Sequence, residues 1–232
     1  MENNFSYIYE NLRIIRERVN EAYAKYRSPE DNVRIMAVTK TVAPEAVNYA
    51  VSLGIDLLGE NRVQEYQSKK DFYDSSAEVH FIGSLQTNKV KYIIDSISMI
   101  HSVDSLKLGE IISRQSVSHG KVTDILCEVN IGGEDSKGGV SPSETGELIE
   151  QLAQLDGIRI RGLMTIPPPS DSDVFLGRMK ELFDRISEDK KSVVSLDVLS
   201  MGMSHDYAEA VKYGSNIVRI GTALFGARNY NR

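Results

Sequence analysis

Short apolar runs alternate with longer amphipathic segments along most of this chain. Residues 7–26 carry apolar side chains at three- and four-residue steps with Arg and Glu between them, which predicts a helix. Beyond this segment, runs rich in Val and Ile are apolar on both faces, as is typical of strands buried in a parallel sheet. Eight such runs follow one another, at residues 33–39, 57–59, 79–82, 99–103, 124–130, 158–164, 196–199 and 217–220.

Each of the first seven runs leads into a stretch with helical features. Pro44 suits a first helical turn, where its missing N–H has no intrahelical partner. Gly54, Gly120, Gly157 and Gly214 fall where helices should end, because glycine tolerates the left-handed cap. The predicted helices cover residues 44–53, 61–73, 88–95, 105–118, 143–155, 174–188 and 205–213.

Strands that alternate with helices indicate a parallel sheet covered by helices. Eight units in roughly 200 residues fit a (β/α)8 barrel. A doubly wound open sheet is the alternative, but it more often has a glycine fingerprint after its first strand, and residues 39–44 contain no glycine. No linker divides the chain. We therefore predict an α/β protein, with residues 1–232 forming a single (β/α)8 TIM barrel that has an extra N-terminal helix.

Composition narrows the possible partners. Charged residues make up 26% of the 232 residues and the net charge is −6, with both signs interspersed, so a nucleic-acid surface is not expected. No apolar stretch approaches the roughly 20 residues that span a membrane, and the N-terminus lacks a signal-peptide pattern. Cys127 is the only cysteine, which excludes an intrachain disulfide and favours a reducing, cytoplasmic location.

Candidate chemistry collects at the predicted C-terminal ends of the strands, where barrel enzymes place their sites. The loops after the seventh and eighth runs are the usual phosphate cradle of this fold. Glycines there let backbone N–H groups approach an anion, and hydroxyls add donors. The residues of this cradle are Ser200, Gly202, Ser204, Gly221 and Thr222.

Two cations flank the predicted cradle. Lys40 ends the first run and Arg219 lies in the last, each on a strand face set by period-two alternation. Closing the barrel makes these two strands neighbours, so both side chains could surround one small molecule. The histidines, by contrast, lack metal-ligand spacing, and we expect no metal site. We expect His101 to cap a strand.

Six segments together resemble the YggS/PROSC family of pyridoxal 5′-phosphate homeostasis proteins. They are AVTKT (37–41), GENRVQE (59–65), HFIGSLQTNK (80–89), RGLM (161–164), LSMGMSHD (199–206) and VRIGTALFG (218–226). The resemblance runs nearly end to end and in order. It implies the barrel domain of alanine racemase without that enzyme's second, β-rich domain.

The resemblance also implies a cofactor and its ligands. Pyridoxal 5′-phosphate (PLP) would form a Schiff base with Lys40, and Arg219 would face the pyridine nitrogen. Ser200, Gly221 and Thr222 would hold the phosphate, while other residues would surround the ring. The complete cofactor-binding set is Lys40, Asn61, His80, Ser84, Ser200, Met201, Arg219, Gly221 and Thr222.

Three functions agree with this pattern. The leading hypothesis is a monomeric, non-catalytic carrier that binds PLP and related B6 vitamers and passes PLP to apo-enzymes in the cytoplasm. A PLP-dependent racemase or lyase of low activity is the alternative, with Lys40 as one base and a local Tyr or His80 as the other. A third is a barrel enzyme acting on a phosphorylated sugar, with Lys40 as an anion contact.

Overall fold

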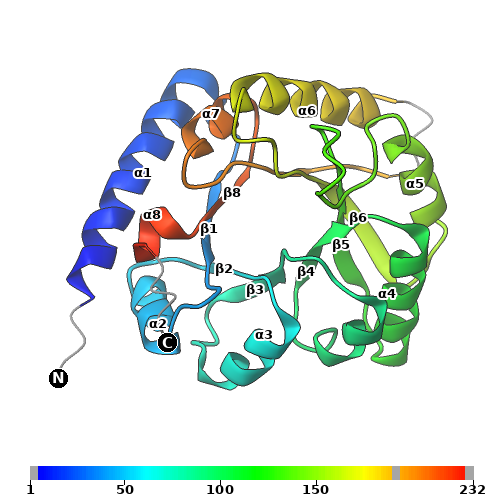
Figure 1. Ribbon diagram of the computed structural model, residues 1–232, viewed down its shortest axis with the longest axis horizontal. Helices are drawn as coiled ribbons and strands as arrows, with labels where there is room; N and C mark the ends of the chain where they lie inside the picture. The colour runs from blue at the N-terminus through cyan, green and yellow to red at the C-terminus, as the bar shows by residue number, and fades with distance from the viewer. Residues whose placement is uncertain (1–4, 190–193, 228–232) are drawn as a thin grey trace.

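Eight parallel strands close into a barrel in the computed structural model, which describes residues 5–189 and 194–227. Each strand pairs with its neighbours in chain order, and β1 pairs with β8 to complete the ring (Figure 1). The predicted (β/α)8 architecture is therefore confirmed. The strands are β1 (Arg34–Val38), β2 (Leu57–Glu60), β3 (Glu78–Phe81), β4 (Met99–Val103), β5 (Thr123–Glu128), β6 (Ile158–Met164), β7 (Val198–Ser200) and β8 (Ile217–Ile220).

Helices surround this ring on the outside (Figure 1). The predicted N-terminal helix is present and packs against α7 and α8. A helix was expected over residues 88–95, but the structure has a 3-10 helix, η2, over Thr87–Tyr92. The helices are α1 (Ser6–Tyr26), α2 (Pro44–Ser52), α3 (Val63–Lys69), η1 (Lys70–Phe72), η2 (Thr87–Tyr92), α4 (Leu106–Ser118), α5 (Thr145–Leu152), α6 (Ser172–Ser187), α7 (Tyr207–Lys212) and α8 (Thr222–Phe225).

Two apolar cores follow from the alternation of side chains along each strand. One fills the barrel and includes Met36, Val38 and Leu126. The other lies between the strands and the helices. It includes Ala37, which lies between Met36 and Val38 in the sequence, and Ile125, which precedes Leu126. A strand residue two positions from a member of the first core therefore has its side chain inside the barrel. This rule shows which polar side chains of the strands face the interior.

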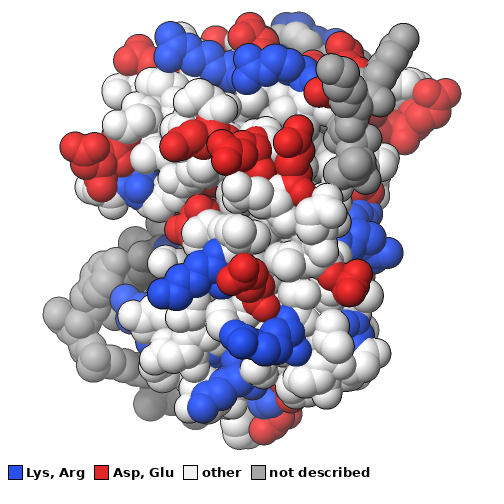
Figure 2. All heavy atoms as spheres, turned by 90° about the vertical axis from the view of Figure 1, so that its right-hand side faces the viewer, with Lys and Arg blue, Asp and Glu red and all other residues white. Residues whose placement is uncertain are grey.

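The surface carries charges of both signs. Figure 2 shows Lys and Arg side chains together with Asp and Glu on the face that Figure 1 has on its right. Ion pairs also occur near the N-terminal ends of the strands, where Arg161 contacts Asp124 and Asp197. Within the ranges given above, none of the helices is long and apolar enough to cross a membrane.

Candidate functional site

Lys40 lies just beyond the C-terminal end of β1. It lies in the turn two residues after Val38, whose side chain faces the barrel interior, and it is partly exposed. The next residue, Thr41, has φ 63°, a left-handed conformation that a β-branched residue rarely adopts. The Thr41 N–H donates to Glu65, which holds this turn in place. Strained backbone of this kind clusters at binding sites.

A buried polar group supports the same turn from outside the barrel. Glu60 is fully buried at the end of β2, where Thr39 Oγ1 lies 2.6 Å from its Oε1 and the Tyr73 hydroxyl donates to the same oxygen. Burial raises the pKa of Glu60. Burial and the neighbouring Glu60 likewise raise the pKa of Tyr73, so its phenol stays protonated and remains a donor. Lys69 Nζ adds a bond of 3.2 Å to the carbonyl oxygen of Thr39.

Arg219 lies inside the barrel on β8, only 4% exposed and opposite Met36 of β1. Its Nη1 donates to the carbonyl oxygen and to the hydroxyl of Ser200, each at 2.8 Å. Its Nη2 donates to the carbonyl oxygen of Thr165, at 2.7 Å, just after β6. Burial lowers the pKa of Arg219 to about 10, so the guanidinium remains charged at neutral pH. The Nε–H and one Nη2–H have no hydrogen-bond partner among residues 5–189 and 194–227.

The loops after β7 and β8 come together as predicted. The Ala223 N–H donates to Ser204 Oγ at 3.2 Å, joining the two loops. Thr222 begins α8 and is exposed. The N–H groups of Leu224 and Phe225 donate to the carbonyl oxygen of Gly221, so within this turn the Thr222 N–H is the one without a partner among the described residues. Gly202 has φ 91°, and a β-carbon there would lie 2.4 Å from that of Ala210, so only glycine fits. Gly221 is partly exposed beside Thr222.

Two predicted residues of these loops have side chains that point elsewhere. Ser200 is fully buried, and its hydroxyl lies inside the barrel between Arg219 and His101. Met201 is also fully buried, and its side chain belongs to the apolar core between strands and helices. Ser204 Oγ is therefore the serine oxygen that lies with Gly221 and Thr222.

Asn61 and Ser84 lie in the loops after β2 and β3. The Asn61 Oδ1 atom is buried and has no hydrogen-bond partner in the part of the chain that the structure describes. A β-carbon at Gly83 would lie 2.1 Å from the Asn61 carbonyl oxygen, so glycine is needed where these loops cross. Ser84 is exposed. An unsatisfied buried amide oxygen is uncommon and indicates a position where a ligand donor can bind.

His80 lies lower in the barrel than the loops. Its ring is 2% exposed and borders a cavity of about 430 Å3 at the N-terminal ends of the strands, together with Arg34 and Asp124. Burial lowers the pKa of His80 to about 4, so the ring is neutral at pH 7. His80 therefore lies on the opposite side of Arg219 from the loops that hold Ser204 and Thr222.

Two polar residues of the barrel interior escaped the sequence analysis. His101 was expected to cap a strand, but it lies within β4 and bonds to His80 and Ser200. Glu128 ends β5, on the inward face with Leu126. Burial and the nearby Asp104 raise the pKa of Glu128 to about 7, while Arg219 opposes this shift. Period-two alternation from Met99 and Leu126 would have found both.

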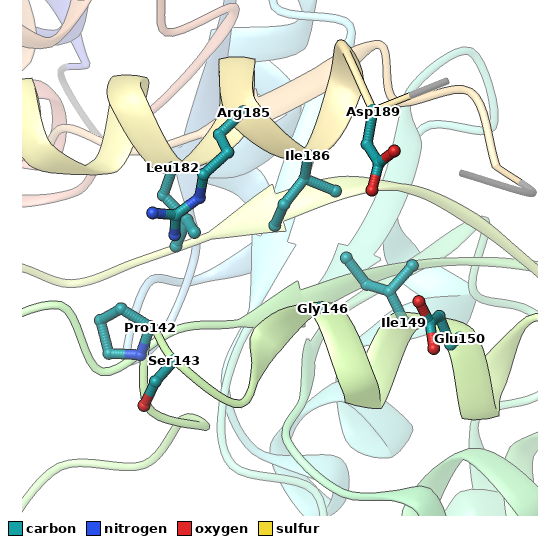
Figure 3. Close-up of a pocket in the computed structure, with 9 residues that line it drawn as sticks. All are labelled: Pro142, Ser143, Gly146, Ile149, Glu150, Leu182, Arg185, Ile186 and Asp189. Carbon is teal, nitrogen blue, oxygen red and sulfur yellow. The ribbon is translucent and has the colours of Figure 1, made fainter. Parts of the chain in front are cut away.

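A separate groove lies in the helical layer, away from these residues. It has a volume of about 400 Å3 and runs between α5 and α6, with Ile149, Leu182 and Ile186 on its apolar floor and Arg185 beside them (Figure 3). None of the nine predicted cofactor-binding residues lines it. The candidate site is thus the C-terminal mouth of the barrel.

The sequence is similar to known proteins over nearly its whole length. Residues 8–229 match the family model of the alanine racemase N-terminal domain. A pyridoxal phosphate homeostasis protein of Aquifex aeolicus is 41% identical over 226 residues, which cover 95% of this chain and 98% of the relative. A protein of the same name from Escherichia coli K12 is 35% identical, with 96% and 97% covered.

Solved structures agree with this relationship. PipY of Synechococcus elongatus, solved with PLP bound, superposes with a TM-score of 0.80 at 29% identity, covering 94% of this chain and all of PipY. An alanine racemase of Clostridium difficile shares the fold, with a TM-score of 0.73 at 17% identity, but this chain covers only 57% of that enzyme. The chain belongs to the family of pyridoxal phosphate homeostasis proteins, which is built on the alanine racemase N-terminal domain.

Proposed function

We propose that this chain binds PLP covalently at the C-terminal mouth of its barrel and serves PLP homeostasis as a carrier. The observation that carries the proposal is the position of Lys40, two residues beyond the C-terminal end of β1 and beside the left-handed residue Thr41. Lys40 supplies the amine for a Schiff base with the aldehyde of PLP. The PLP-bound PipY structure and the names of the relatives support PLP as the ligand.

The residues of the mouth fit the remaining groups of PLP. The hydroxyls of Ser204 and Thr222 and the N–H of Thr222 provide donors for a phosphate, whereas the Ser200 hydroxyl serves Arg219. Asn61 Oδ1 lacks a partner within residues 5–189 and 194–227 and can accept a hydrogen bond from the ligand. We assign no direct contact to His80, because its ring lies below Arg219.

Arg219 sets the protonation state of the ring nitrogen of PLP in this proposal. Its Nε–H and one Nη2–H remain available to a ring nitrogen, and an arginine donates without giving up its proton. The nitrogen then stays unprotonated, so PLP held here withdraws electrons less strongly than PLP paired with a carboxylate.

A PLP-dependent racemase or lyase is the second candidate. One observation favours it: Glu128 faces the barrel interior near Arg219 with a pKa of about 7, which is suitable for acid–base chemistry. The base that the sequence suggested, His80, lies too deep for that role. Assaying racemisation, elimination and decarboxylation over the common amino acids separates the two candidates. Turnover of roughly 1 s⁻¹ or above would favour the enzyme and contradict the carrier.

The covalent link is tested by borohydride reduction. The purified protein should be yellow after incubation with PLP, and reduction followed by peptide mass spectrometry should place the label on Lys40. Lys40→Ala should lose the label and keep the fold. Lys107→Ala, an exposed lysine of α4, is the matched control and should keep both. A label distributed over other lysines in wild-type protein would refute the assignment.

The remaining properties belong to the same proposal. We propose a monomer that works in the cytoplasm and delivers PLP to apo-enzymes. A single cysteine, Cys127, which is fully buried, is consistent with a reducing compartment. Size-exclusion chromatography with light scattering tests the monomer, and transfer of PLP to an apo-enzyme faster than from free solution tests delivery.

A further inference from the structure

Four side chains form a hydrogen-bonded interior network through the barrel. Arg219 Nη1 lies 2.8 Å from Ser200 Oγ, which is 3.1 Å from His101 Nδ1. His101 Nε2 is 2.9 Å from His80 Nδ1. All four residues are at most 4% exposed, and they come from β8, β7, β4 and β3. The interior network therefore connects the arginine beneath the candidate site with the opposite end of the barrel.

At its far end the interior network meets a carboxylate. His80 Nε2 lies 3.5 Å from Glu78 Oε2, at the cavity between the N-terminal ends of the strands. Glu78 also accepts a hydrogen bond from Arg34 at 3.0 Å. The interior network thus begins at a buried cation, Arg219, and ends beside an anion that faces solvent.

The hydrogen bonds of the interior network have one direction. Arg219 can only donate, so Ser200 Oγ accepts from it and has its own proton to give to His101 Nδ1. His101 must then carry its proton on Nε2, where it donates to His80 Nδ1. His80 in turn carries its proton on Nε2, which points to Glu78. Each neutral imidazole is fixed in the Nε2–H tautomer.

The reverse direction is disfavoured at both ends. If His101 donated from Nδ1, the Ser200 hydroxyl proton would have no acceptor among the described residues. His80 Nε2 would then be unprotonated and would direct its lone pair at the Glu78 carboxylate. Burial lowers the pKa of both histidines, of His80 to about 4 and of His101 well below its usual value, so neither gains a second proton at neutral pH.

We infer that Ser200, His101 and His80 are positioning residues for Arg219, which they hold in the orientation that presents its remaining donors to the ring nitrogen of PLP. This inference rests on the proposed function. The carbonyl oxygens of Thr165 and Ser200 accept hydrogen bonds from Arg219, and the Ser200 hydroxyl connects the guanidinium to His101 and His80 below it. An oriented chain of dipoles also stabilises the buried charge of Arg219, which has no direct carboxylate partner within residues 5–189 and 194–227.

Histidine tautomers test the inference without any cofactor. In 15N NMR of the PLP-free protein at neutral pH, His80 and His101 should both show Nδ1 unprotonated and Nε2 protonated. In Ser200→Ala, His101 should lose the hydrogen-bond shift at Nδ1. An Nδ1–H tautomer for either ring in wild-type protein would overturn the direction of the network, whether or not PLP binds.

The effect of the interior network on PLP binding is tested with two variants of the network and one control. Ser200→Ala and His101→Leu should bind PLP about fivefold to tenfold more weakly and shift the 15N resonance of its labelled ring nitrogen. Ser102→Ala is the control, because Ser102 is a buried serine of β4 whose Oγ has no partner in the described residues. It should change neither quantity.

Two outcomes distinguish this inference from the proposed function. If Ser200→Ala folds like the wild type and keeps both the affinity and the ring-nitrogen resonance, the positioning role is refuted while PLP binding stands. His101→Leu gives the same information should Ser200→Ala be unstable. Wild-type protein that retains no PLP would instead refute the proposed function.

Discussion

Glu128→Gln should change how stability depends on pH. Glu128 ends β5 on the inward face, near Asp104 and Arg219. Burial is the main reason that its pKa rises from an ordinary value of 4.5 to about 7. Glutamine has nearly the same shape as the protonated acid but cannot ionise. Comparing the two proteins therefore isolates the ionisation of this one carboxyl.

The sign and size follow from proton linkage. Below pH 4.5 Glu128 is protonated in the folded and unfolded states, and the folded state has its full stability. As pH rises to about 7 the unfolded chain releases this proton while the folded chain retains it, so the free energy of unfolding falls. A difference of 2.5 between the two pKa values corresponds to a loss of about 3 kcal/mol.

Urea unfolding of the PLP-free proteins measures this directly. Glu128→Gln should match the wild type at pH 4.5 and exceed its free energy of unfolding by about 3 kcal/mol at pH 8.5. Glu110→Gln removes a carboxylate at an exposed position on α4, and its difference from the wild type should not grow in this way with pH. A difference between Glu128→Gln and the wild type that stays constant with pH would refute the reasoning.

Two further predictions concern packing. Gly162→Ala should lower the free energy of unfolding by more than about 3 kcal/mol in urea titrations, because its β-carbon would lie 1.7 Å from the Val198 carbonyl oxygen. Gly146→Ala in α5, with no atom within 4 Å of the added carbon, should be neutral or slightly stabilising, and equal losses in both would contradict this account. Cys127 should react with iodoacetamide only after unfolding, because the thiol is buried and burial raises its pKa to about 12. Mass spectrometry detects the label, and labelling of the native protein within minutes would disprove this prediction.

Much of the fold could be predicted because buried parallel strands leave a strong signal. The apolar run at residues 33–39 and β1 agree within one residue at each end, and the run at 158–164 coincides with β6. The type of helix in the segment after β3 was harder to predict. A helix was predicted over residues 88–95, whereas the structure has the short 3-10 helix η2 over Thr87–Tyr92, and the residue pattern does not distinguish the two helix types.

The site was predicted only in part, since long-range pairing decides where a side chain points. Alternation alone predicts an inward face for Lys40 and Arg219, and the structure places Arg219 inside the barrel. Ser200 stands at the boundary between β7 and its loop, where alternation cannot tell whether its hydroxyl turns inward or toward a phosphate. Its contacts with Arg219 and His101 come from strands far apart in sequence and settle the matter. The sequence contains no local signal for such contacts.

A crystal structure of the protein with PLP tests the central claim most directly. The account predicts continuous electron density from Lys40 Nζ to the cofactor, with the ring nitrogen against Arg219 and the phosphate beside Ser204 and Thr222. Density for PLP at any other lysine, or in the groove between α5 and α6, would contradict it.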